Sequence, residues 1–226
     1  MLSNAGLNLQ AVFNIDDLPD DITKPLQDHC DGLSSFTQLL LIGHGGRSLW
    51  ENVKQSWLSS SNPINEYTMD TIHQYFAKEL PGHELKFVYP SSIPIGLRAL
   101  GELAGWHHDS PFRVGVNAEW GPWFAYRAVV LSNTSFIPTQ ANKTVSPCDT
   151  CQDKICLSKC PGDALEGGSL VLNTCLDYRK QEGSLCQDKC LSRMSCPVGS
   201  AHRYTNEQIN FHYGRSMDVI RNWKPA

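Results

Sequence analysis

Residues 148–161 read CDTCQDKICLSKCP, which places four cysteines within one short stretch. Four more follow before residue 197, whereas Cys30 is the only cysteine ahead of residue 148. The eight clustered cysteines are Cys148, Cys151, Cys156, Cys160, Cys175, Cys186, Cys190 and Cys196. This clustering divides the chain into a long region with one cysteine, a short cysteine-rich segment and a final stretch. Cys30 is expected to be a buried, inert thiol.

The cysteine spacing is similar to that of two-cluster ferredoxins. A [4Fe–4S] cube needs four thiolates, and the cysteine that precedes a proline typically binds the other cluster. Both halves of the segment end in this way, at Cys160-Pro161 and Cys196-Pro197. The pattern therefore predicts two [4Fe–4S] clusters, the first held by Cys148, Cys151, Cys156 and Cys196 and the second by Cys160, Cys175, Cys186 and Cys190.

Two other interpretations of these cysteines stay open. Cys148-x2-Cys151 with a later Cys-x3-Cys pair is also compatible with Cys₄ zinc sites, which would make the protein a zinc-stabilised binding module. A disulfide-rich segment is the covalent alternative, but the start of the chain lacks a basic region and a continuous apolar region, so a secretion signal is not expected. We therefore expect a cytoplasmic protein, in whose reducing surroundings metal ligation is favoured over disulfides.

Composition excludes several other classes of protein. The chain of 226 residues and 25.2 kDa is 41% hydrophobic and 19% charged, with a formal net charge of -4 and a sequence pI near 6.0. Its apolar content predicts a folded protein, and the absence of a basic block gives no electrostatic reason to expect nucleic acid or an anionic membrane as a partner. The longest strongly apolar stretch, Leu39–Gly43, is far shorter than the roughly 20 residues of a membrane-spanning helix.

The region before the cysteines has the pattern of a mixed α/β domain. We predict strands at 36–43, 85–89, 112–116 and 125–131, and helices at 47–58, 62–80 and 97–103. After the cysteines, Thr205-x-x-Gln208 has the spacing of a capping box and predicts a helix to about Asn222. We expect an α/β domain at 1–142, a ferredoxin-like domain at 143–202 and a C-terminal helix at 203–226 that packs back on the α/β domain.

Three short motifs join this pattern to a known family. They are PIGLRALGELAG at 94–105, GPWF at 121–124 and CPGDAL at 160–165. Together with the cysteine run, they resemble the epoxyqueuosine reductase family and its shorter ferredoxin-like relatives, over roughly residues 36 to 200. The resemblance implies a nitroreductase-like α/β domain that holds a cobalamin and receives electrons through two [4Fe–4S] clusters in a C-terminal ferredoxin-like domain.

The sequence departs from that family at two places. Leu97 stands where the reductase has an acidic proton donor, and Gly105-Trp106-His107-His108-Asp109-Ser110 stands where it has Gly-x-x-Gly-Lys-Asn. Both differences argue against epoxyqueuosine reduction itself. The leading hypothesis is an iron–sulfur electron-transfer protein with a redox protein as donor or acceptor, and a cobalamin-dependent reductase is the alternative.

Five further residues are candidates for contact with a corrinoid or a small-molecule substrate. His44 and Arg47 flank the glycines of a Gly-His-Gly-Gly-Arg turn, which could present backbone N–H groups to a ligand or serve only as a turn. His107 and His108 could ligate cobalt or relay protons, or form a polar loop. Trp123 could stack on a flat cofactor or fill the core.

Overall fold

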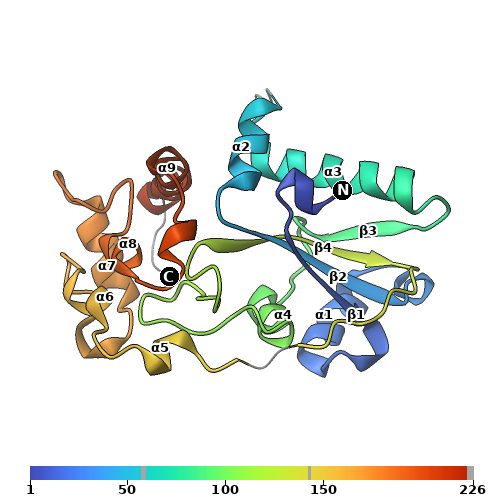
Figure 1. Ribbon diagram of the computed structural model, residues 1–226, viewed down its shortest axis with the longest axis horizontal. Helices are drawn as coiled ribbons and strands as arrows, with labels where there is room; N and C mark the ends of the chain where they lie inside the picture. Colours follow the sequence, from blue (N-terminus) through green and yellow to red (C-terminus); the bar gives the residue numbers. More distant parts are fainter. Residues whose placement is uncertain (57–59, 142–143, 223–226) are drawn as a thin grey trace. The chain divides into compact units, whose positions relative to one another are not determined.

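The computed structural model describes residues 1–56, 60–141 and 144–222 (Figure 1). The chain divides into two compact units, the first formed by Met1–Trp106 and Phe124–Lys143 and the second by His107–Trp123 and Thr144–Ala226. This division differs from the expected one in two ways. Residues 107–123 and the C-terminal helix both belong to the second unit, and the expected boundary at residues 142 and 143 lies outside the described residues.

A four-stranded antiparallel sheet is the centre of the first unit. Its strands are β1 (Leu9–Asn14), β2 (Gln38–Gly45), β3 (Leu85–Tyr89) and β4 (Phe124–Ser132), in the order β1-β2-β4-β3. Every residue of the central strand β2 is buried. A continuous apolar run such as Leu39–Ile42 is typical of a strand that is covered on both faces.

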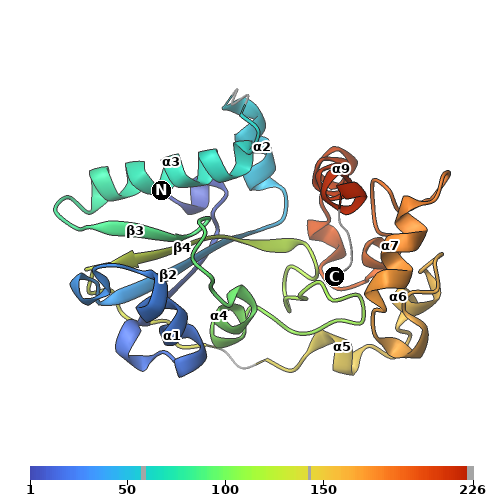
Figure 2. The ribbon, with the colours of Figure 1, turned by 180° about the vertical axis from the view of Figure 1, so that it is seen from behind.

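Helices cover both faces of this sheet (Figures 1 and 2). The helices α2 (Ser48–Gln55) and α3 (Pro63–Glu79) lie on one face, and α1 (Asp20–His29) and α4 (Leu97–Leu103) lie on the other. Single 3₁₀ turns complete the unit at Ser3–Ala5, Ile15–Asp17 and Leu33–Ser35. The mixed α/β class predicted from the sequence is confirmed.

Most of the predicted elements are present, and one is wrong. The bounds of β3 and α4 are those predicted. The ends of the other predicted elements, β2, β4, α2 and α3, differ from the predicted ends by at most about three residues. The predicted end of α2, at Leu58, lies outside the described residues. The predicted strand at 112–116 does not form. This segment contains a turn with Arg113 at a φ of 59°, and it pairs only through an isolated bridge between His108 and Val116.

The second unit consists of short helices around the cysteines. They are α5 (Pro147–Thr150), α6 (Ile155–Ser158), α7 (Leu172–Lys180), α8 (Leu191–Ser195) and α9 (Asn206–Asn222), with 3₁₀ turns at Glu166–Gly168 and Ser200–His202. α6 packs on α8, and α7 packs on α9. Thr205 Oγ1 accepts a hydrogen bond from the N–H of Gln208 at 3.2 Å, so the predicted cap starts α9. No helix in the described ranges has both the length and the hydropathy that a bilayer crossing requires.

The apolar face of α4 provides a test of packing in the first unit. Leu100 is fully buried, whereas Leu97 is only partly buried. Leu100→Ala is expected to destabilise the protein by about 2–5 kcal/mol, and Leu97→Ala by less, because the penalty follows the buried contacts that are lost. Denaturant unfolding of the two variants checks this order, and a larger loss for Leu97→Ala would contradict it.

Candidate metal centre

The cysteine-rich segment begins each of its halves with the same local turn. Ser146 Oγ accepts a hydrogen bond from the N–H of Cys148, and Ser184 Oγ accepts one from the N–H of Cys186, each at 3.2 Å. A serine two residues ahead of a cysteine can satisfy the backbone N–H at that position and so fix the start of the ligand loop. Neither serine was among the predicted site residues, although the repeated Ser-x-Cys spacing is a signal that the sequence contains.

Four of the thiols form a first group, which we call the first quartet: Cys148, Cys151, Cys156 and Cys196. Burial, followed by repulsion from the other three thiols, raises the pKa of Cys148 to about 11. Burial and then repulsion from neighbours in the group also raise the pKa of Cys156 and Cys196. Cys156 and Cys196 pack in one small core with Phe112, Val116 and Leu165.

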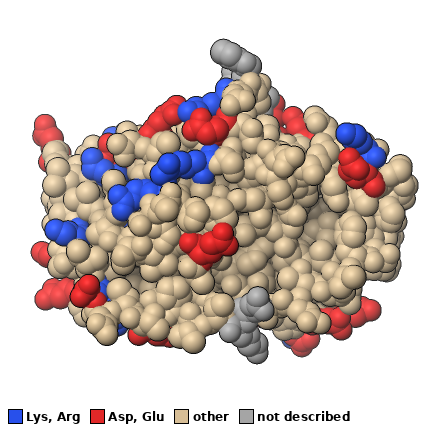
Figure 3. All heavy atoms as spheres, in the orientation of Figure 1, with Lys and Arg blue, Asp and Glu red and all other residues tan. Residues whose placement is uncertain are grey.

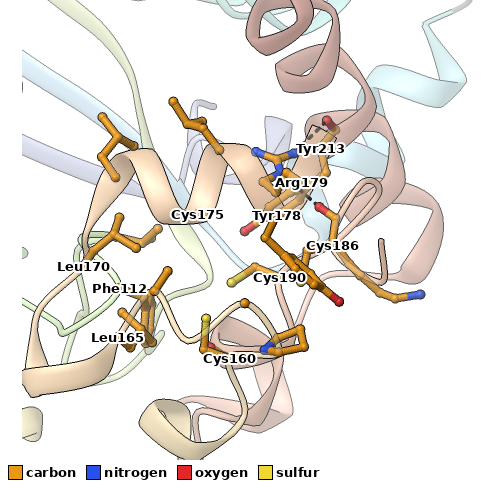
Figure 4. A pocket seen from close by; sticks show the side chains of 18 residues that line it. Phe112, Cys160, Leu165, Leu170, Cys175, Tyr178, Arg179, Cys186, Cys190 and Tyr213 are labelled. Atoms are coloured by element: carbon orange, nitrogen blue, oxygen red, sulfur yellow. Dashed lines mark hydrogen bonds between the residues drawn. The ribbon is translucent and has the colours of Figure 1, made fainter. Parts of the chain in front are cut away.

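The other four thiols form the second quartet: Cys160, Cys175, Cys186 and Cys190. They line a cavity of about 200 Å³ together with apolar side chains that include Phe112, Leu165 and Leu170 (Figure 4). Burial, followed by repulsion from Cys190, contributes most to raising the pKa of Cys175 to about 11. Burial likewise raises the pKa of Cys186. The cavity offers thiol ligands in surroundings that exclude much of the solvent.

The thiols of the described residues are not arranged as a preformed zinc tetrahedron. Zinc–sulfur bonds of about 2.3 Å in a tetrahedron place the sulfurs roughly 3.8 Å apart, yet no three cysteine sulfurs among the described residues all lie within 4.8 Å of one another. The cavity volume of about 200 Å³ is more than ten times the roughly 10–15 Å³ that holds one water molecule. All nine cysteines are free thiols, so the disulfide alternative has no support.

Arg193 joins the second quartet to the loop at residues 117–123. Its backbone N–H donates to Cys190 Sγ at 3.5 Å, and its guanidinium donates to the Pro122 carbonyl at 2.6 and 3.2 Å. The same guanidinium lies over the rings of Trp123, at 4.8 Å, and Tyr204, at 5.3 Å. Trp123 is fully buried in this core, which suits the core-filling interpretation of this residue. Its stacking on a flat cofactor stays a prediction.

The two histidines that precede this loop also have partners within the second unit. His107 Nε2 lies 3.4 Å from a carboxylate oxygen of Asp109, and the His107 side chain is only 9% exposed. His108 Nε2 lies 3.0 Å from Thr144 Oγ1. Both contacts suit a structured polar loop, and the predicted roles as cobalt ligand or proton relay stay predictions.

His44 and Arg47 belong to the first unit and differ in exposure. His44 is fully buried on β2, and its Nδ1 accepts a hydrogen bond from Arg127 Nε at 2.9 Å. Because a guanidinium can only donate, this contact places the His44 proton on Nε2. Arg127 lies at a β-bulge, between the register pairs Ile42–Ala128 and Gly43–Tyr126, and bulges often redirect a side chain. Arg47 is exposed at the start of α2.

Comparison with known proteins finds relatives among solved structures alone. No protein-family model and no curated protein sequence matches the chain. An epoxyqueuosine reductase from Bacillus subtilis, solved with its catalytic loop swung out of the active site, superposes with a TM-score of 0.55 at 14% identity. An epoxyqueuosine reductase solved with an epoxyqueuosine-modified tRNA stem loop gives 0.54 at 15% identity. The chain has the fold of an epoxyqueuosine reductase.

The superposition covers most of this chain and part of each reductase. It includes 90% of the chain and 64% of the Bacillus subtilis enzyme, and 92% of the chain and 66% of the enzyme with the stem loop. A B12-trafficking protein from C. elegans, CblC, superposes with a TM-score of 0.51 at 12% identity, over 95% of this chain and 89% of its own. The epoxyqueuosine reductase fold is thus shared with proteins of different activities, and identities this low establish the fold alone.

Proposed function

We propose that this protein is an iron–sulfur electron-transfer protein. In this proposal the first and second quartets each hold one [4Fe–4S] cluster, and electrons pass between a redox partner and a cofactor or substrate on the α/β unit. The observation that carries the proposal is the gathering of eight thiols into two groups of four, with sulfur spacings too wide for a preformed zinc tetrahedron. The epoxyqueuosine reductase fold supports it.

The residues of the second unit contribute ligands, positioning and shielding. The eight cysteines supply thiolates, and because burial raises the thiol pKa of Cys148 and Cys175 to about 11, loading must release protons and weaken as the pH falls. Ser146, Ser184 and Arg193 hold the ligand loops through hydrogen bonds. Bound clusters would supply one-electron redox chemistry at potentials set by burial, charge and hydrogen bonds to sulfur.

A cobalamin-dependent reductase is the second candidate function. One observation favours it: similar structures include both epoxyqueuosine reductases and a B12-trafficking protein. His44 and Arg47, both in the first unit, are the residues that we propose for contact with a corrinoid. Leu97, at the position where the family has an acidic proton donor, argues for a substrate other than epoxyqueuosine.

Metal content and corrinoid binding separate these candidates in one preparation. The protein, purified without oxygen, is expected to contain about eight iron and eight sulfide per chain, as two cubes require, with broad visible absorption. Hydroxocobalamin is then added and the protein is separated from free corrinoid, after which cobalt and the visible spectrum are measured. Retained corrinoid would favour the reductase.

Two outcomes would overturn the iron–sulfur proposal. Zinc without iron would favour the zinc-stabilised module, and a metal-free protein with cysteine disulfides would leave neither metal proposal standing. About four iron per chain would keep the electron-transfer function but limit it to one cluster.

Nucleic acid binding needs its own measurement. The composition gives no reason to expect it, yet one structure with this fold contains a tRNA stem loop. On the face drawn in Figure 3, lysine and arginine side chains gather over the part of the second unit that carries α9, with acidic side chains among them. We propose that this mixed charge favours a protein redox partner, and titration of the holoprotein with a tRNA stem loop tests the proposal, since tight and salt-dependent binding would contradict it.

A further inference from the structure

Arg179 is a buried cation at the wall of the cavity that the second quartet lines. It lies on α7 and is 8% exposed. Its Nε donates to the carbonyl of Cys186 at 2.9 Å, and its Nη2 donates to Ser216 Oγ at 2.9 Å, to the Gln187 carbonyl at 3.3 Å and to the Tyr213 carbonyl at 3.4 Å. All of these acceptors are neutral, and the bonds to Cys186 and Tyr213 can be followed in Figure 4.

No carboxylate in the described ranges forms an ion pair with this guanidinium. The ring of Tyr213, 5.2 Å from the guanidinium carbon, is again a neutral neighbour. The hydrogen bonds from Nε and Nη2 to carbonyl and hydroxyl oxygens leave the charge itself without compensation. A buried cation of this kind destabilises a fold unless an anion lies close to it.

The cavity is where such an anion can lie. Arg179 is among the residues that line it, beside Cys175 and Cys186. The Arg179 charge lowers the pKa of both thiols against the larger effect of burial, so it favours their thiolate forms. Four thiolates around a [4Fe–4S] core form a group with a net negative charge. Such a group in the cavity would be the anion that compensates the charge of Arg179.

We propose that Arg179 is the counter-charge of the cluster held by the second quartet and makes the reduction potential of that cluster less negative. The inference rests on the proposed iron–sulfur function. Reduction adds one electron, and therefore one negative charge, to the cluster. A fixed positive charge in low-dielectric surroundings stabilises the more negative form, so it favours reduction. Arg179 acts through the cluster surroundings and is a positioning residue.

The next residue on the same helix offers a matched control. Lys180 is exposed, so Lys180→Gln removes the same unit charge from a position where solvent screens it. Arg179→Gln removes the buried charge and keeps an amide donor for the carbonyl acceptors. Arg179→Lys keeps the positive charge but loses the planar guanidinium and its several N–H donors.

Anaerobic redox titration of the holoproteins, followed by electron paramagnetic resonance, measures the midpoint of each cluster. Arg179→Gln is expected to shift one midpoint to a more negative potential and to leave the other close to wild type. Lys180→Gln is expected to change both midpoints much less, and Arg179→Lys is expected to restore the wild-type midpoint. Equal shifts in Arg179→Gln and Lys180→Gln, or an unchanged midpoint in Arg179→Gln with full iron content, would overturn the inference.

If Arg179→Gln loses the second cluster altogether, the Arg179→Lys variant decides whether the inference holds. If Arg179→Lys keeps the cluster at the wild-type midpoint, the charge is what matters and the inference stands. If Arg179→Lys also loses the cluster, the hydrogen bonds donated by the guanidinium are essential rather than its charge, and the inference fails. Wild-type protein without iron would refute the proposed function itself, which is a separate result.

Discussion

Cys156→Ala is expected to lose half of the iron and half of the sulfide, about four of each per chain, because one thiolate of the first quartet is removed. Cys156 is buried between Cys196 and the apolar side chains of its small core, so no solvent group can easily replace the missing ligand. Iron and sulfide quantitation, together with the visible spectrum of protein purified without oxygen, measures the effect.

Two comparisons make this result specific. Cys30→Ala is the matched control, because Cys30 is equally buried but lies at the end of α1 in the first unit, and it should keep full iron content. Combining Cys156→Ala with Cys196→Ala should lose no more iron than Cys156→Ala alone, whereas combining it with Cys190→Ala should remove nearly all of it. Full iron content in Cys156→Ala would refute the assignment of this ligand.

Gly121→Ala is expected to destabilise the second unit by about 3 kcal/mol or more, and to reduce loading of the first quartet. Gly121 has a φ of +59°, and an added Cβ would lie 1.9 Å from the carbonyl oxygen of Val198. The same contact is seen from the other side at Gly199, which has a φ of +60°. A Cβ added there would lie 2.3 Å from the carbonyl carbon of Trp120. The backbone that follows Cys196 therefore packs directly on the loop at 117–123, and a methyl group must separate the two.

Gly183→Ala separates the effect of this contact from that of the backbone conformation. Gly183 also lies in the second unit with a φ of +74°, but an added Cβ would meet nothing within 4 Å. It should lose only about 1–2 kcal/mol, from the left-handed conformation alone. Thermal unfolding and iron content are measured for both variants, and equal losses would show that the loop can move away from Val198.

Local patterns in the sequence predicted much of the first unit. The apolar run at Leu39–Ile42 marked β2, and the proline at position 63 marked the start of α3. β1 was missed because it lies at the edge of the sheet, where only Ala11 of its six residues is buried, so no continuous apolar run signals it. The segment at 112–116 has strand-forming residues, but its pairing is confined to single bridges within a loop.

The sequence by itself determined the chemistry available to this protein: eight thiols at ferredoxin-like spacing and the local strands and helices of an α/β unit. Spacing and periodicity are properties of neighbouring residues, so they can be read without coordinates. Only the tertiary structure decided that residues 107–123 belong with the cysteines, that Trp123 is core, and that Arg179 is buried among neutral acceptors beside the second quartet. These features depend on contacts between residues far apart in the chain, and burial and the compensation of charge exist only once those contacts have formed.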